Sequence, residues 1–240
     1  MYDLVKPFFV TVSGTLLQQM YEAGQICLAP ALYLIDKNPM HVLHSKYVKA
    51  TAEHEHTLAW AGPINFNSMH EPDPILGTRS DEQAAVVRCK MRPVILLSPA
   101  NDPWQDSRRR SDDCYLVAPV YRFGGDESKE AYTAEFVQRV QAYAYNTLFY
   151  LPANDKPNFL EGFVRFDRLQ VVHRSWLTQR PIRLSEQALE CLEAWLSVYV
   201  CPEMATLWCK DVGFHCMPNW LRFILDYREN MMKELGVGAP

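Results

Sequence analysis

The sequence has no excess of charge of either sign. Its 240 residues include 24 lysines and arginines against 28 aspartates and glutamates, a net charge of −4. A protein that is held on nucleic acid or anionic lipid by its overall field is strongly basic. The composition therefore excludes that mode of binding, and any site for RNA or DNA has to be local.

Long apolar runs and secretion signals are also lacking. The most apolar internal stretch, 23–35, is interrupted by Gln25 and Pro30 and is too short to span a bilayer. Residues 1–10 do not combine a basic segment with a long apolar run. The seven cysteines are scattered and odd in number, which favours a reducing compartment. We expect a cytoplasmic protein that makes no contact with a membrane.

Two common kinds of catalytic loop are missing as well. The ten glycines form no phosphate-cradling loop, and no serine-nucleophile elbow occurs, which argues against a nucleotide-binding enzyme or an esterase. There is no Cys-x-x-Cys motif, and His41, His44, His54 and His56 lack the recurring Cys or carboxylate partners of a structural zinc site. We therefore expect no metal and no cofactor.

What is present is the composition of an ordinary folded protein, with 48% hydrophobic and 22% charged residues. Strands are expected at 6–12, 25–29, 93–97, 114–121, 148–151 and 162–172, and helices at 128–145, 185–200 and 218–235. The polar, Pro-rich segment 36–78 indicates long connections with short elements. The expected order, in which strands with one inserted helix come first and helices follow, favours an α+β fold. In particular it favours a small, strongly bent barrel decorated by helices.

The strand expected at 162–172 carries the sharpest chemical feature. Arg165 and Asp167 are two residues apart, so in a strand they project from the same face, guanidinium beside carboxylate. Such a pair is often an exposed ion pair of little energetic weight. It also suits RNA cleavage, in which the carboxylate takes the proton of the 2′-hydroxyl and the guanidinium stabilises the phosphate charge. The two residues alone leave both interpretations open.

Several segments, in order, resemble the MazF/PemK/Kid toxin family. Residues 161–172, with the Arg-x-Asp pair, look like one strand of that family. Residues 91–98 resemble its Arg-Pro signature ahead of an apolar strand that ends in Ser or Thr, and 116–120 is similar to its next strand, which also ends in a Pro. Residues 24–28 resemble the opening strand, and 185–200 lies where the closing helix would be.

The resemblance implies an SH3-like barrel, usually a homodimer, that acts as a metal-independent endoribonuclease on single-stranded RNA and has an antitoxin protein as a partner. Attack by the 2′-hydroxyl would leave a cyclic phosphate. Carried over to this sequence, Arg92 would hold the scissile phosphate, Asp167 would be the base, and Arg165 the acid or charge stabiliser. The alternative is a non-catalytic barrel module that binds a protein or RNA partner, as the gyrase-poisoning relatives do.

Two departures from the family pattern concern substrate binding. The family usually has a Thr or Ser hydroxyl after the Pro of the middle strand, whereas here Val120 is followed by Tyr121, whose phenol would replace it. The acidic-Gln pair of the family would correspond to Glu82 and Gln83, but eight residues separate them from Arg92. We expect these three side chains to contact the RNA.

An arginine run adds a further candidate contact. Arg108, Arg109 and Arg110 lie between the two clearest strands, where three guanidinium groups would collect phosphates. The opposing interpretation is a solvated loop tip, since four aspartates within 102–113 largely cancel the charge.

The chain is about twice the usual size of the family. We expect a barrel domain at 1–200 with enlarged loops at 30–78 and 128–145, and a C-terminal helical extension at 201–240 packed on it.

Overall fold

The computed structural model describes ten stretches of the chain: 5–12, 21–32, 41–48, 53–60, 85–86, 89–97, 114–124, 132–154, 159–203 and 219–236. In 41–48, 53–60, 85–86 and 219–220 the description covers the backbone only. The contacts divide the chain into two compact units. One consists of 1–30 together with 91–240, and the other of 31–90.

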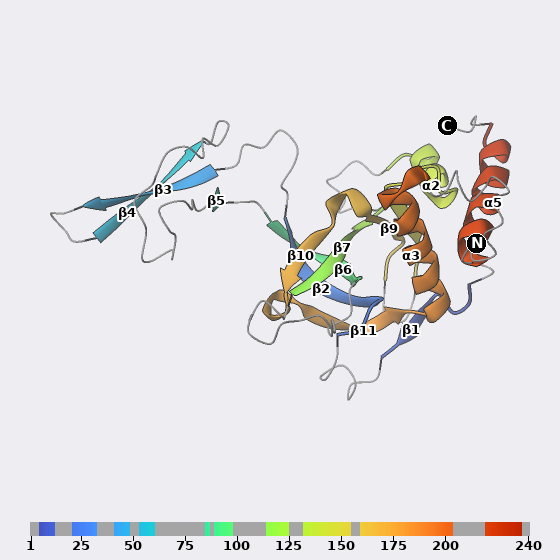
Figure 1. The fold of residues 1–240 in the computed structure, drawn as a ribbon, viewed down its shortest axis with the longest axis horizontal. Coiled ribbons are helices and arrows are strands. Elements are labelled where there is room, and N and C mark those ends of the chain that lie inside the picture. Colours follow the sequence, from blue (N-terminus) through green and yellow to red (C-terminus); the bar gives the residue numbers. More distant parts are fainter. Residues whose placement is uncertain are drawn as a thin grey trace. The chain divides into compact units, whose positions relative to one another are not determined.

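The larger unit contains an eight-stranded, mostly antiparallel sheet (Figure 1). The strand order is β1-β11-β2-β6-β7-β9-β8, and β10 pairs with β7 beside this path. The strands are β1 (Phe9–Thr11), β2 (Gln25–Leu32), β6 (Cys89–Leu96), β7 (Cys114–Arg122), β8 (Leu148–Leu151), β9 (Gly162–Arg165), β10 (Gln170–His173) and β11 (Thr178–Leu184).

The α+β class predicted from the sequence is confirmed, but the sheet is not closed into a barrel within the described residues. Its path begins at β1 and ends at β8, which do not pair with each other. A helix, not another strand, meets β8: the indole Nε1 of Trp195 donates a hydrogen bond to the carbonyl oxygen of Leu148 at 2.9 Å. The last strand of the path is therefore covered without closure.

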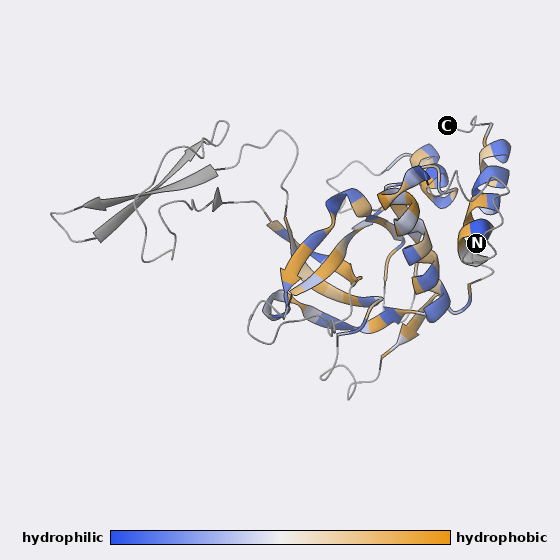
Figure 2. Ribbon diagram, in the orientation of Figure 1, coloured by the Kyte–Doolittle hydropathy of each residue, from blue (hydrophilic) through white to orange (hydrophobic). Residues whose placement is uncertain are grey.

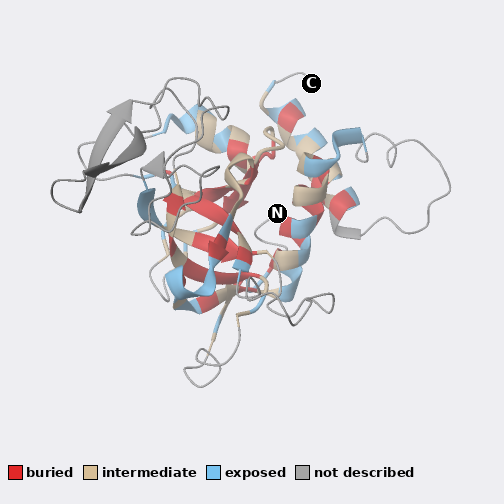
Figure 3. Ribbon diagram, turned by 60° about the vertical axis from the view of Figure 1, so that its left-hand side comes forward, coloured by how far each residue is buried: buried red, intermediate tan, exposed pale blue. Residues whose placement is uncertain are grey.

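One face of the sheet packs on α3 (Glu186–Val200), and the strands contribute buried apolar residues to the core between them (Figures 2 and 3). The helix begins at Ser185, whose hydroxyl accepts a hydrogen bond from the Ala188 amide at 3.2 Å, so the predicted N-cap is confirmed. Leu221 and Ile224 from α5 (Asn219–Glu234) join the same core.

The opposite face of the sheet carries α2 (Ala134–Gln141), which is shorter than the helix expected at 128–145. Thr133 caps its N-terminus by accepting a hydrogen bond from the Phe136 amide. Beyond its C-terminus, Tyr143 adopts a left-handed conformation with φ of 55°, which cannot continue a helix. The beginning of the expected segment, 128–131, lies outside the described residues.

The single strand expected at 162–172 is divided into β9 and β10 by η1, a 3-10 turn at Phe166–Arg168. Both strands pair with β7, β9 at Val120–Arg122 and β10 at Cys114–Val117. The turn places Phe166, which is 1% exposed, in the core. Burial of the Phe166 side chain therefore stabilises the turn between β9 and β10.

The smaller unit is inserted between β2 and β6, two neighbours in the sheet. It contains β3 (His41–Val48), β4 (Glu53–Trp60) and β5 (Ala85–Val86) in the order β4-β3-β5. β3 and β4 pair along their full eight-residue lengths. These strands are longer than the short elements expected in this segment, because their many polar residues conceal the strand pattern.

In the described part of the chain, no helix combines the length and the apolar character needed to cross a membrane.

Candidate functional site

Arg165 and Asp167 form a two-pronged ion pair at the corner between β9 and η1. Nε of Arg165 donates to Oδ1 of Asp167 at 3.0 Å, and Nη2 donates to Oδ2 at 2.5 Å. Arg165 is 32% exposed and Asp167 is 31% exposed, so solvent reaches both side chains. The planar guanidinium matches the carboxylate in a bidentate geometry, which fixes both groups in orientation.

The ring of Tyr121 connects Arg92, another predicted site residue, to this ion pair. The guanidinium carbon of Arg92 lies 4.5 Å from the centroid of the Tyr121 ring, and that of Arg165 lies 5.5 Å from it. Both distances are in the range of a cation–π interaction. Arg92, Tyr121, Arg165 and Asp167 therefore form one contiguous group, which we call the arginine–tyrosine cluster.

The register of three neighbouring strands explains why these residues meet. β6 pairs with β7 through Val94 and Pro119, and continuing this register by two residues brings Arg92 opposite Tyr121. Tyr121 in turn lies opposite Phe163 of β9. Arg165 is two residues beyond Phe163, so it projects from the same face of the sheet. Arg92, Tyr121 and Arg165 are thus positioned by strands, and Asp167 follows in η1.

Gly162 permits β9 to approach β7 closely enough for this arrangement. A Cβ atom at Gly162 would lie 2.1 Å from the carbonyl oxygen of Tyr121. No side chain is tolerated at such a distance, so a glycine is required at this position. The residue that allows the approach is therefore in direct backbone contact with the centre of the cluster.

Aromatic side chains surround the cluster on one side. The Tyr121 ring stacks on Phe163 with centroids 5.8 Å apart, and Tyr132 meets Phe163 edge-on at 5.4 Å. Tyr132 is 43% exposed, while Phe163 is buried. Exposed aromatic rings beside guanidinium groups are the arrangement on which unpaired bases stack in proteins that bind single strands.

Arg165 and Asp167 each stabilise the charged form of the other. Burial raises the pKa of Asp167, but the hydrogen bonds and charge of Arg165, together with the charge of Arg168, outweigh it and hold this pKa below its ordinary value. The hydrogen bond to Asp167 raises the pKa of Arg165 further. At neutral pH the site therefore contains an ionised carboxylate and permanently charged guanidinium groups.

The structure brings together four of the nine predicted site residues. The others, Arg108, Arg109, Arg110, Glu82 and Gln83, lie outside the described residues, and their positions relative to the cluster stay predictions.

Two neighbours of the cluster were not expected from the sequence. Nε of Arg168 lies 3.8 Å from Oδ2 of Asp167. In a continuous strand Arg168 would point away from Asp167, and only η1 turns it to the same side. Tyr132 is 33 positions before Arg165 in the chain, and no local pattern connects the two residues.

Among the described side chains, no group of three or more His, Cys, Asp or Glu residues is arranged to hold a metal ion. The side chains of His41, His44, His54 and His56 lie outside that description.

No protein-family model matches the sequence, and no curated protein matches it.

Proposed function

We propose that the protein is a metal-independent endoribonuclease that cleaves single-stranded RNA at the arginine–tyrosine cluster. The observation that carries the proposal is that Arg92 and Arg165 lie on the Tyr121 ring, while Asp167 is held against Arg165. The cluster thus combines two phosphate-binding cations, a ring for a base and a proton acceptor. These are the groups that transfer of a phosphoryl group to a neighbouring hydroxyl requires.

The proposed reaction uses the RNA's own 2′-hydroxyl. Arg92 binds the scissile phosphate, and Asp167 accepts the proton of the 2′-hydroxyl as its oxygen attacks phosphorus. The bond from phosphorus to the 5′-oxygen breaks, and that oxygen takes up a proton. Arg165 stabilises the charge that develops on the phosphate oxygens. The products are a 2′,3′-cyclic phosphate and a free 5′-hydroxyl, and no co-reactant is needed.

We interpret the bent, open sheet as an enlarged SH3-like barrel of the MazF/PemK/Kid kind, in which β9 carries Arg165 and β6 carries Arg92. Antiparallel strands in this order, followed by α3, support the interpretation. A homodimer and an antitoxin partner follow only from the resemblance to that family.

The decisive experiment is cleavage of a long, mostly unstructured RNA by the purified protein in excess EDTA. We expect discrete cuts that end in cyclic phosphates. Asp167→Asn should lower the rate on the order of a hundredfold or more, as loss of a general base does. Arg165→Ala and Arg92→Ala should lower it as well, because each removes a phosphate cation.

Matched controls separate the site from general effects of charge. Asp226→Asn and Arg222→Ala change exposed residues on α5, far along the chain from the cluster, and should cleave like the wild type. Thermal unfolding of each variant shows whether a loss of rate reflects misfolding. Wild-type protein that leaves the RNA intact would refute the nuclease.

A second candidate function, RNA binding without cleavage, is favoured by the ion pair itself. Arg165 engages both carboxylate oxygens of Asp167 and keeps the pKa of that group low, which makes Asp167 a weak proton acceptor. In this case the cluster would retain single-stranded RNA, with an affinity that falls as salt rises, and produce no cuts. Gel-shift titrations at two salt concentrations, run beside the cleavage assay, distinguish the two functions.

A further inference from the structure

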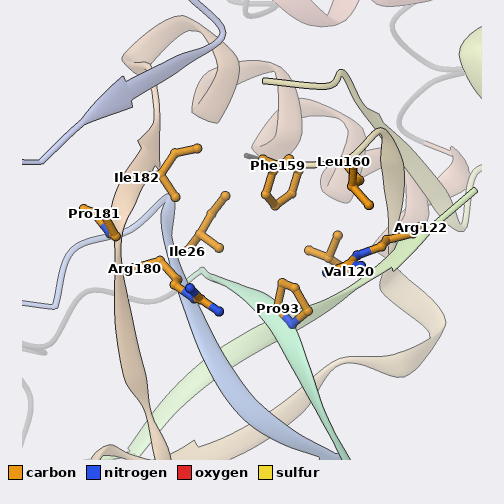
Figure 4. Close-up of a pocket in the computed structure, with 9 residues that line it drawn as sticks. All are labelled: Ile26, Pro93, Val120, Arg122, Phe159, Leu160, Arg180, Pro181 and Ile182. Carbon is orange, nitrogen blue, oxygen red and sulfur yellow. The ribbon is translucent and has the colours of Figure 1, made fainter. Parts of the chain in front are cut away.

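A pocket opens on the sheet face opposite to the arginine–tyrosine cluster. Its volume is about 180 Å³, and Pro93 and Val120 contribute to its lining (Figure 4). Pro93 directly follows Arg92, and Val120 directly precedes Tyr121. Neighbouring residues of a strand point to opposite faces of the sheet. The pocket is therefore a separate site that the proposed nuclease does not use.

The pocket exists because β11 is locally bulged against β2. Gln179 lies opposite Cys27 and Arg183 opposite Gln25, so three residues of β11 face only Ile26. These three, Arg180, Pro181 and Ile182, all line the pocket, as does Ile26. Bulges redirect side chains and are frequent beside functional sites. The irregular register thus creates both the opening and its lining.

The floor of the pocket is apolar and its rim is cationic. Ile26, Val120 and Ile182 are almost fully buried beneath it, and Phe159 forms a wall. The side chains of Arg122 and Arg180 approach from opposite sides with their nitrogen atoms directed inward (Figure 4). Neither guanidinium forms an ion pair within the described part of the chain. Two cations that lack an ionic partner among the described residues thus face one apolar cavity.

We propose that this pocket binds a small acid, consisting of a compact apolar body that carries a carboxylate or a phosphate. A cavity of about 150 Å³ lined by Leu, Ile and Phe is known to hold benzene, so the present volume suits an apolar group of that size. Guanidinium groups recognise carboxylate and phosphate alike, and an anion would compensate both arginines at once. None of the described residues that line the pocket is acidic, so none of them competes for the two arginines.

Calorimetric titration of the full-length protein with hexanoate, hexyl phosphate and the neutral hexanamide tests the proposal. At least one acid should bind about tenfold or more tightly than hexanamide, since hydrogen bonds to charged groups contribute about 1.5 kcal/mol or more. The acid that binds more tightly identifies the anionic group. Hexanamide that binds as tightly as both acids, or the absence of binding by either acid, would overturn the proposal.

Variants of the two rim arginines locate the binding. Arg122→Gln and Arg180→Gln change exposed residues, so the fold should persist, and each should weaken binding of the acid about fivefold or more without affecting hexanamide. Arg222→Gln, on the exposed face of α5, is the matched control and should bind like the wild type. Unchanged acid binding in both rim variants would contradict the assignment. RNA cleavage does not enter this readout, so failure here is distinguishable from failure of the nuclease.

Discussion

At the scale of the residue, Tyr121 is the centre of the candidate site because two guanidinium groups share its ring. An aromatic ring that attracts two like charges offsets part of their mutual repulsion, and it holds both cations where a phosphate would bind. The ring of Tyr121 thus contributes to the site through its contacts with Arg92 and Arg165.

Substitution of Tyr121 separates the role of its ring from that of its hydroxyl. We expect Tyr121→Phe to retain RNA binding within about twofold, because the ring and its contacts with Arg92 and Arg165 persist. Tyr121→Leu should weaken binding about fivefold, since a cation–π contact contributes about 0.5–1 kcal/mol at partly exposed sites and two would be lost. The measurement is a fluorescence titration with a short labelled RNA. A large loss in Tyr121→Phe would instead assign the contact to the hydroxyl.

The low pKa of Asp167 determines how the stability of the protein should depend on pH. A carboxyl group whose pKa is lower in the folded state stabilises the fold above its unfolded pKa, near 3.9, and this contribution disappears as pH falls through the folded value. The stability difference between wild type and Asp167→Asn should therefore be constant from pH 7 to 5 and shrink below about pH 4. Urea unfolding across this range measures it. Because Asp167 stays ionised between pH 7 and 5, its protonation should cause no loss of cleavage rate in this range.

The sequence was sufficient to select the four residues that the structure brings together, Arg92, Tyr121, Arg165 and Asp167. Arg92, Arg165 and Asp167 could be chosen because their local motifs are visible in single segments. The contribution of Arg168 could not be foreseen, because it depends on a 3-10 turn within an apparently regular strand. The alternating residues of 162–167 satisfy a strand and the turn equally well, and only the burial of Phe166 in the core distinguishes them.

At the scale of the element, the strands with apolar runs were predictable and the lengths of the other elements were not. β6, β7 and β8 contain continuous buried stretches that mark them in the sequence. The extent of α2 depends on the left-handed conformation of Tyr143, which is not a residue that signals a helix end. Tertiary contacts therefore decided the boundaries that the local pattern left open.

The close approach of β9 to β7 gives a prediction at this scale. Gly162→Ala should destabilise the protein by about 1–3 kcal/mol, because the new methyl group would overlap the Tyr121 carbonyl and force the strands apart. Chemical denaturation measures the loss. Gly124→Ala, two residues beyond β7, is the control, since no atom lies within 4 Å of a Cβ placed there. Equal stability of the two variants would show that the strands separate without cost.

At the scale of the whole molecule, the unit at 31–90 interrupts a pair of neighbouring strands. β2 and β6 are each eight residues long, and the Gly24 amide donates to the Leu96 carbonyl at 2.8 Å, as in an antiparallel hairpin. The insertion therefore replaces what would otherwise be a tight turn. A long connection between paired strands adds little entropic cost, because loop closure grows only slowly with length.

Replacement of residues 33–88 by Asn-Gly tests this organisation. The two residues favour a hairpin turn that suits the twist of paired strands, so β2 and β6 should still pair and the larger unit should fold cooperatively. Circular dichroism during thermal unfolding should show one transition. An aggregated or unfolded product would mean that the larger unit depends on the insertion.

The strand order at one edge of the sheet has a consequence for synthesis. β11 lies between β1 and β2 and pairs with both, Phe9 with Leu184 and Cys27 with Gln179. Among the described strands, β1 thus has no partner until β11, which follows all the others in the chain, has been synthesised. Chains that stop before β11 expose the edges of β1 and β2, and such edges recruit other strands. Chains whose synthesis stalls before residue 178 would therefore be prone to aggregation, whereas synthesis of β11 pairs the edges of β1 and β2 in a single late step.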